Sequence, residues 1–143
     1  MNPKTLNILL VEDSQEDIDL MMEALKGSAV LNVVHVVKNG QEAMDYLRDP
    51  TKGRPNIILL DLNMPKKNGR QVLKEIKSDP GLKVIPVVIL TTSRSQNDVL
   101  ECYLNQCNCY ICKPIDLEGF FKVVRKIEEF WFNLVELPPG FST

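Results

Sequence analysis

Long apolar runs are the most obvious absence from this sequence. No stretch of about 18 consecutive apolar residues occurs, and no apolar h-region precedes Leu6, so neither a membrane span nor a signal peptide is indicated. Basic residues are scattered, and 17 Lys and Arg against 19 Asp and Glu give a formal net charge of −2. This balance offers no electrostatic basis for nucleic-acid binding. We therefore expect a cytoplasmic protein without nucleic-acid or membrane partners.

Histidine is almost absent, and the few cysteines lack the spacing of a metal site. His35 is the only histidine and lies in an apolar run, which favours a structural strand residue over a catalytic base. The cysteines follow the pattern C-x4-C-x-C-x2-C, which matches neither paired zinc ligands nor a ferredoxin. Metal binding and redox sensing remain alternatives, but we expect buried, reduced thiols at Cys102, Cys107, Cys109 and Cys112.

The sequence does contain a regular alternation of short apolar runs with amphipathic, helix-like segments. Five such pairs in 143 residues predict one α/β domain, a doubly wound and mostly parallel sheet with helices on both faces. Nearly continuous apolar runs are typical of strands that are covered on both sides. Pro86 interrupts the fourth run, so we expect its hydrogen-bonded part to begin near Val87. The runs are 6–11, 33–37, 56–60, 84–90 and 109–112.

Polar and charged residues follow four of the five expected strands. Glu12 and Asp13 end the first run, Asp61 the third, Thr91 the fourth and Lys113 the fifth. Right-handed crossovers bring the carboxyl ends of parallel strands to one edge of the sheet, where ligands bind in such folds. We therefore expect these side chains to converge, although each one taken alone could be an ordinary cap or turn residue.

The chemistry of this set indicates phosphoryl transfer. Three carboxylates within about 4 Å repel one another by several kcal/mol, so they require a divalent cation, and oxygen ligands suit Mg²⁺. A carboxylate such as Asp61 can attack phosphorus to form an acyl phosphate. Lys113 would hold a phosphoryl oxygen and Thr91 would donate a hydroxyl hydrogen bond.

These residues, with Asp61-Leu-Asn-Met-Pro65 and Lys113-Pro114, resemble the receiver domains of two-component response regulators over about residues 6–131. The resemblance implies a sheet of strand order 2-1-3-4-5 and a phosphoacceptor Asp61 that is served by a sensor histidine kinase. It also implies that Glu12, Asp13, Asp61 and the backbone carbonyl of Asn63 bind Mg²⁺.

The same resemblance implies a switch pair and two local features. Thr91 would turn toward the phosphoryl group and Tyr110 would move inward, although Tyr110 could simply be a packed strand aromatic. The Lys113-Pro114 peptide is expected to be cis. Thr92 stands where the family often has a small residue, so we expect a long-lived phosphoryl group.

The C-terminal stretch carries more apolar residues than one helix face can bury. Val123 falls in the surplus, and the stripe expected to face the core is Leu117, Phe120, Phe121, Val124, Ile127 and Trp131. We expect a receiver domain over 1–131 and an apolar extension over 132–143 that forms a homodimer, although this tail could instead fold back on its own domain. The stretch resembles the tail of phytochrome-associated receivers, which implies a light-regulated histidine kinase as partner. The expected dimer contacts are Phe130, Trp131, Phe132 and Leu134.

Two other functions remain open. An aspartate-nucleophile phosphatase would usually carry a second Asp two residues after the first, whereas this chain has Asn63, so we expect no enzyme beyond self-phosphorylation and self-dephosphorylation. A phosphorylation-independent adaptor would keep the fold without the chemistry. Little sequence follows Trp131, so we expect no output domain and an output through protein contacts.

Overall fold

The computed structural model describes residues 5–64, 67–92, 96–113 and 116–134, and in them strands and helices alternate strictly. Every strand pairing is parallel, and the order β2-β1-β3-β4-β5 confirms the expected sheet. The strands are β1 (Leu6–Val11), β2 (Asn32–Val37), β3 (Ile57–Leu60), β4 (Val87–Thr91) and β5 (Cys109–Cys112). The helices are α1 (Gln15–Lys26), α2 (Gly40–Arg48), α3 (Gly69–Ser78), α4 (Gln96–Leu104) and α5 (Leu117–Leu134).

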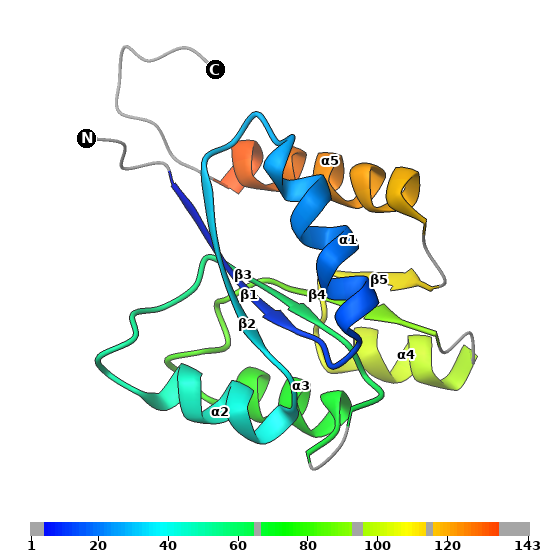
Figure 1. Cartoon of the computed structure of the whole chain (residues 1–143). Helices are drawn as coiled ribbons and strands as arrows, with labels where there is room; N and C mark the ends of the chain where they lie inside the picture. The colour runs from blue at the N-terminus through cyan, green and yellow to red at the C-terminus, as the bar shows by residue number, and fades with distance from the viewer. Residues whose placement is uncertain (1–4, 65–66, 93–95, 114–115, 135–143) are drawn as a thin grey trace.

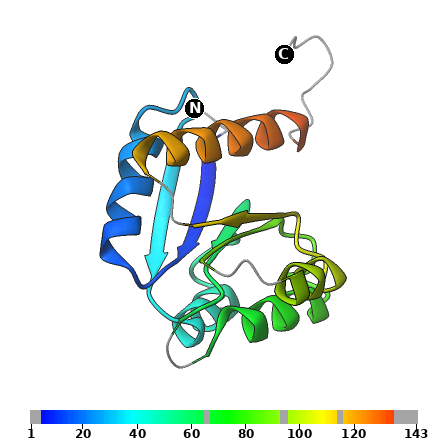
Figure 2. The same ribbon diagram turned by 90° about the vertical axis from the view of Figure 1, so that its right-hand side faces the viewer.

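The sheet is the middle of three layers. Helices α1 and α5 lie side by side on one face, and α2, α3 and α4 cover the other (Figures 1 and 2). Strand β3 shows why a central strand is apolar throughout: Ile57 and Leu59 pack on the α1 and α5 side, whereas Ile58 and Leu60 pack on the opposite side. No described helix is long and apolar enough to cross a membrane.

The chain turns from strand to helix at residues that cap the helix amino ends. The Ser14 Oγ accepts a hydrogen bond from the Asp17 backbone N–H at 3.3 Å and so caps the start of α1. The Asn39 and Asn68 side chains cap α2 and α3 in the same way. These caps fix where each helix begins, close to the carboxyl ends of the strands.

The buried face of α5 differs from the predicted one at two residues. Phe121 is 36% exposed and Val123 only 3%, so the core stripe was wrong at Phe121 and Val123 belongs to the core. The reason is that the buried face of α5 also contains Phe120, Val124 and Ile127, and Phe121 lies beside it. The helix also runs to residue 134, past residue 131, where the receiver domain was expected to end.

The exposure of each cysteine and of His35 depends on where the residue lies in the fold. Cys102 and Cys107 are buried free thiols as expected, but Cys109 and Cys112 are only half-buried, so that expectation was wrong for these two. They lie on β5, an outer strand of the sheet, where the cover is thinner. His35 lies on the other outer strand, β2. Its ring packs edge-on against the ring of Tyr46, with the two ring centroids 4.9 Å apart.

Candidate functional site

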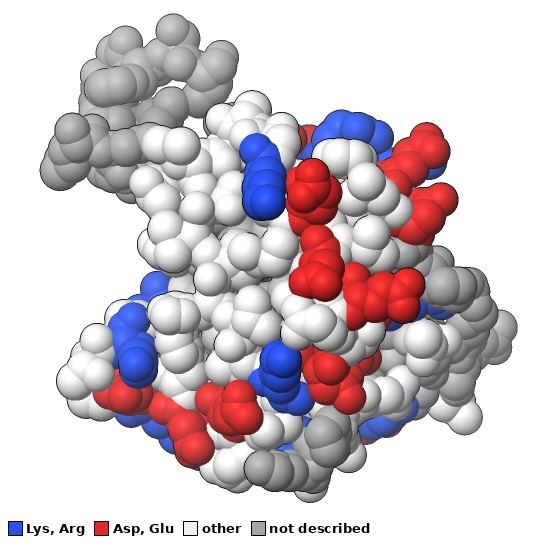
Figure 3. Space-filling view, in the orientation of Figure 1, with Lys and Arg blue, Asp and Glu red and all other residues white. Residues whose placement is uncertain are grey.

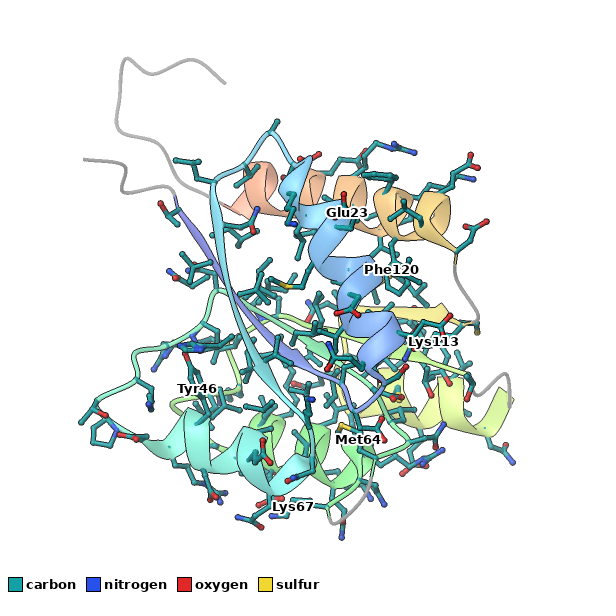
Figure 4. All side chains as sticks on the ribbon, viewed as in Figure 1. Glu23, Tyr46, Met64, Lys67, Lys113 and Phe120 are labelled. Carbon is teal, nitrogen blue, oxygen red and sulfur yellow. The ribbon has the colours of Figure 1, made fainter. Side chains whose placement is uncertain are left out.

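The residues expected at the strand ends meet at one edge of the sheet. Backbone hydrogen bonds extend past the regular strands: the Asp61 N–H donates to the Val11 carbonyl at 3.0 Å, and the Lys113 N–H donates to the Thr91 carbonyl at 2.7 Å. These bonds hold each functional residue in register with the neighbouring strand. The expected convergence is therefore confirmed (Figure 4 labels Lys113).

Three carboxylates form a compact group of oxygen atoms at this edge. One carboxylate oxygen each from Glu12, Asp13 and Asp61 lie within 4.8 Å of one another. Glu12 is 2% exposed and Asp61 6%, whereas Asp13 is exposed at the mouth of the group. Hard oxygen donors at this spacing fit a divalent cation, because a cation removes the repulsion between the buried charges.

Lys113 supplies the opposite charge, and it has more partners than expected. Its buried ammonium donates to the Glu12 carboxylate and, at 2.8 Å, to the Asp17 Oδ2, and it lies 3.7 Å from the Asp61 Oδ2. Asp17 was not among the residues expected at the site. Its position four residues after Asp13, in the first turn of a helix that begins at the site, is the signal that could have identified it.

Burial and charge shift the acidity of these groups. Burial is the largest cause that raises the pKa of Glu12 to about 7, and the neighbouring Asp61 charge adds to it. Burial likewise raises the pKa of Asp61, while the Lys113 charge opposes the shift. Burial disfavours the Lys113 ammonium, but its hydrogen bonds to Asp17 and Glu12 outweigh that effect, and its pKa is raised.

Asn63 connects the acidic group with Thr91. Its backbone N–H donates to the Asp61 Oδ1 at 3.1 Å, which holds this carboxylate in place. Its side-chain amide donates to the fully buried Thr91 hydroxyl at 3.1 Å and reaches the exposed Thr92 hydroxyl at 3.4 Å. The expected coordination of a cation by the Asn63 carbonyl stays a prediction.

A glycine lets α3 approach the loop that carries Asp61. The Gly69 N–H donates to the Leu62 carbonyl at 2.9 Å. A Cβ at Gly69 would lie 2.2 Å from the Asp61 carbonyl oxygen and 2.6 Å from the Leu62 Cα. Because both of these atoms belong to the backbone, no side-chain movement could make room. This contact was not expected from the sequence, because it joins two elements whose separation no local pattern encodes.

The remaining expected residues lie near the site or beyond the described part. Tyr110 is half-buried and packs against the core on the α2, α3 and α4 side, so both interpretations of its role stay open. The cis bond expected before Pro114 lies outside the described residues. The four residues expected at the dimer interface lie in α5, but their side chains are outside the part of the chain that the structure describes.

Comparison with known proteins identifies relatives along nearly the whole chain. The family model of the response regulator receiver domain matches residues 8–125. Response regulator Rcp1 of Synechocystis sp. is 48% identical over 135 residues, which are 92% of each chain. The probable methanogenesis regulatory protein FilR2 of Methanothrix harundinacea is 39% identical over 88% of this chain and 83% of its own.

Solved structures agree with this relationship. The Mn²⁺-bound form of Rcp1 matches with a TM-score of 0.83 and 47% identity, over 93% of this chain and 99% of its own. The phosphorylated cyanobacterial phytochrome response regulator RcpA has the same TM-score and 50% identity, over 94% of this chain and 99% of its own. With its parallel sheet and its acidic group at the carboxyl edge, the chain belongs to the response regulator receiver domain family.

Proposed function

We propose that the protein is a phosphorylation switch in which Asp61 accepts a phosphoryl group from a histidine kinase while the site holds Mg²⁺. One observation carries this proposal: the nearly buried Asp61 carboxylate lies 3.7 Å from the Lys113 ammonium and beside the carboxylates of Glu12 and Asp13. A nucleophile, a cation site and a positive charge are thus assembled around one carboxyl group. The similar Rcp1 has been solved in a Mn²⁺-bound form, which supports the binding of a divalent cation by this chain.

In the proposed step, an Asp61 carboxylate oxygen bonds to phosphorus as the phosphorus–nitrogen bond of a phosphohistidine breaks. The electron pair of that bond stays on the imidazole nitrogen. Mg²⁺, bound by Glu12, Asp13, Asp61 and the Asn63 carbonyl, would neutralise charge on the phosphoryl oxygens. Lys113 stabilises another of these oxygens electrostatically.

The proposed switch begins at Thr91. Its buried hydroxyl accepts a hydrogen bond from the Asn63 amide, so it already lies on the Asp61 side of the sheet edge. The hydroxyl turns to donate to the phosphoryl group, and Tyr110 moves inward over the space that Thr91 leaves. The surface formed by α4 and β5 changes as a result and transmits the signal to a partner protein.

We propose a phytochrome-type, light-regulated histidine kinase as the phosphoryl donor. The similar RcpA is described as a phytochrome response regulator, and a further solved relative, the bacteriophytochrome response regulator RtBRR, is 41% identical with a TM-score of 0.74. RtBRR matches over 95% of this chain and 86% of its own. Faster phosphorylation by such a kinase than by unrelated histidine kinases is the expected result.

The central test is intact mass after incubation with Mg²⁺ and acetyl phosphate. The wild type is expected to gain the mass of one phosphoryl group, and both Asp61→Asn and excess EDTA should abolish the gain. If neither acetyl phosphate nor a phytochrome-type kinase modifies the wild type, the phosphoacceptor function is wrong and an adaptor that works without phosphorylation replaces it.

An aspartate-nucleophile phosphatase is the less favoured chemistry. The residue two positions after Asp61 is Asn63, whose side-chain amide donates to Thr91 and Thr92 and cannot serve as a general acid. Turnover of a generic phosphomonoester such as p-nitrophenyl phosphate should therefore be undetectable. Sustained turnover that is lost in Asp61→Asn would favour the enzyme instead.

A further inference from the structure

The Lys113 ammonium has a partner that the proposed chemistry does not require. Phosphoryl transfer needs this ammonium next to Asp61, yet its nitrogen lies 2.8 Å from the Asp17 Oδ2 and 3.7 Å from the Asp61 Oδ2. Asp17 comes from the first turn of α1, whereas the other site residues lie at or just after the ends of strands. Glu12, directly after β1, is the closest described partner of Lys113, and Asp17 adds a second carboxylate that holds the ammonium toward the start of α1.

The contact between Asp17 and Lys113 is fixed and poorly screened. The Asp17 backbone N–H is tied to the Ser14 Oγ cap at 3.3 Å, which sets the position of its side chain in the first turn. The Lys113 side chain is 5% exposed and the Asp17 side chain 23%, so solvent and salt screen this pair less than they screen a pair at the open surface.

We propose that Asp17 is a positioning residue that anchors the Lys113 ammonium on the α1 side and thereby opposes phosphorylation of Asp61. Phosphorylation adds negative charge at Asp61, and this charge is best neutralised when the ammonium moves toward it. Asp17 competes for the same ammonium and also repels the added charge. This inference rests on the proposed phosphoacceptor role of Asp61.

The test compares Asp17→Asn with wild type in acetyl phosphate and saturating Mg²⁺, with the rate of phosphorylation followed by intact mass. The Asn side chain keeps the shape but removes the charge, and a rate increase of about three- to tenfold is expected for one unit charge at this range. Beryllofluoride, which mimics a phosphoryl group on a carboxylate, should bind Asp17→Asn more tightly by a similar factor. A merely structural role for Asp17 predicts slower phosphorylation and weaker binding instead.

Two matched variants test whether the effect requires the loss of charge at position 17 itself. Glu16→Gln removes an exposed acid from the same first turn of α1 and should match the wild type. Figure 3 shows that acidic side chains gather over this helix, so the loss of charge alone is a necessary control. Asp17→Glu keeps the charge and should resemble the wild type more than Asp17→Asn does. Thermal unfolding checks that each variant is folded.

The outcomes separate the two proposals. If the wild type is phosphorylated and Asp17→Asn is no faster, or if Glu16→Gln is accelerated equally, Asp17 does not position Lys113 and this inference is wrong. If the wild type is phosphorylated by no donor, the phosphoacceptor role itself is wrong.

Discussion

Glu12 is the residue whose acidity should make cation binding depend on pH near neutrality. Burial raises its pKa to about 7, and only its carboxylate form can bind a cation. Below that pKa a proton must leave before the cation enters, so the affinity falls as the pH falls. We expect the dissociation constant for Mg²⁺, measured by titration calorimetry, to rise by up to about tenfold per pH unit between about pH 7 and 6.

The control for this pH dependence is Glu12→Gln, which keeps the shape of the side chain but cannot titrate. It should bind Mg²⁺ more weakly at pH 8 and show a flatter profile, with the raised pKa of Asp61 responsible for the remaining slope. A wild-type affinity that is constant from pH 8 to 6 would contradict the assignment of Glu12 as a buried ligand that titrates near neutrality.

The cysteines provide a second prediction at the residue scale. Burial raises the pKa of Cys107 to about 11, and Cys102 is almost inaccessible. Because the thiolate is the reactive form, both should resist iodoacetamide at pH 8 in the folded protein, whereas the half-buried Cys109 and Cys112 should react first. Peptide mass mapping before and after unfolding in urea measures this order. Early modification of Cys107 would show that this part of the core opens readily.

Thr92 is expected to control the lifetime of the phosphoryl group. It is exposed beside the site, and its hydroxyl lies 3.4 Å from the Asn63 amide nitrogen, so it occupies space that an attacking water would need. Thr92→Ala should shorten the lifetime of phospho-Asp61 by several-fold, measured as loss of phosphoryl mass after the donor is removed. A lifetime of seconds in the wild type, or no change in the variant, would contradict this role.

At the scale of elements, the amino end of α3 must touch the loop that carries Asp61. Gly69→Ala would place a Cβ 2.2 Å from the Asp61 carbonyl oxygen, so the helix or the loop must move. We expect the free energy of unfolding to fall by about 1–3 kcal/mol in urea denaturation, with slower phosphorylation because Asp61 is displaced.

Gly27 supplies the matched control for this substitution. A Cβ at Gly27, after the end of α1, would meet its nearest neighbour at 3.6 Å, which is ordinary contact. Gly27→Ala should therefore leave both stability and phosphorylation close to wild type. Equal losses in the two variants would show that the effect of Gly69→Ala does not come from the close approach of α3.

Helix α5 shows what a pattern within one element can and cannot predict. Its apolar spacing correctly predicted a buried stripe that contains Phe120, Val124 and Ile127. The predicted stripe was wrong at Phe121 and Val123. Periodicity determines which residues share a helix face, but it does not determine where the neighbouring elements stop covering that face. Phe121 lies at the edge beside α1, where a Cβ at Gly27 would be 3.6 Å from its ring.

At the scale of the whole molecule, we propose that the C-terminal part of the chain forms a homodimer. Residues 130–134 form the last part of α5, and the C-terminal stretch as a whole contains more apolar residues than one helix face can bury. Trp131→Ala should reduce concentration-dependent dimerisation, measured by analytical ultracentrifugation. Thermal unfolding of the variant checks that the monomer remains folded. If the variant dimerises as strongly as the wild type, the proposed interface is wrong.

The sequence by itself determined the fold and most of the site. Nearly continuous apolar runs can be satisfied only by strands that are covered on both faces, and parallel strands deliver the residues that follow them to one edge. Once the runs ending at Val11, Leu60 and Cys112 were identified, the meeting of Glu12, Asp61 and Lys113 followed from topology.

The tertiary structure alone decided how these groups pair. Distances between side chains from different elements depend on how helices seat on the sheet, and no local pattern encodes that. The contact of Asp17 with Lys113 joins residues 96 positions apart, and it exists because the first turn of α1 lies against the carboxyl edge of the sheet. The close approach of Gly69 to Asp61 arises in the same way. Sequence supplied the chemistry of the site, and packing between elements set the geometry in which that chemistry operates.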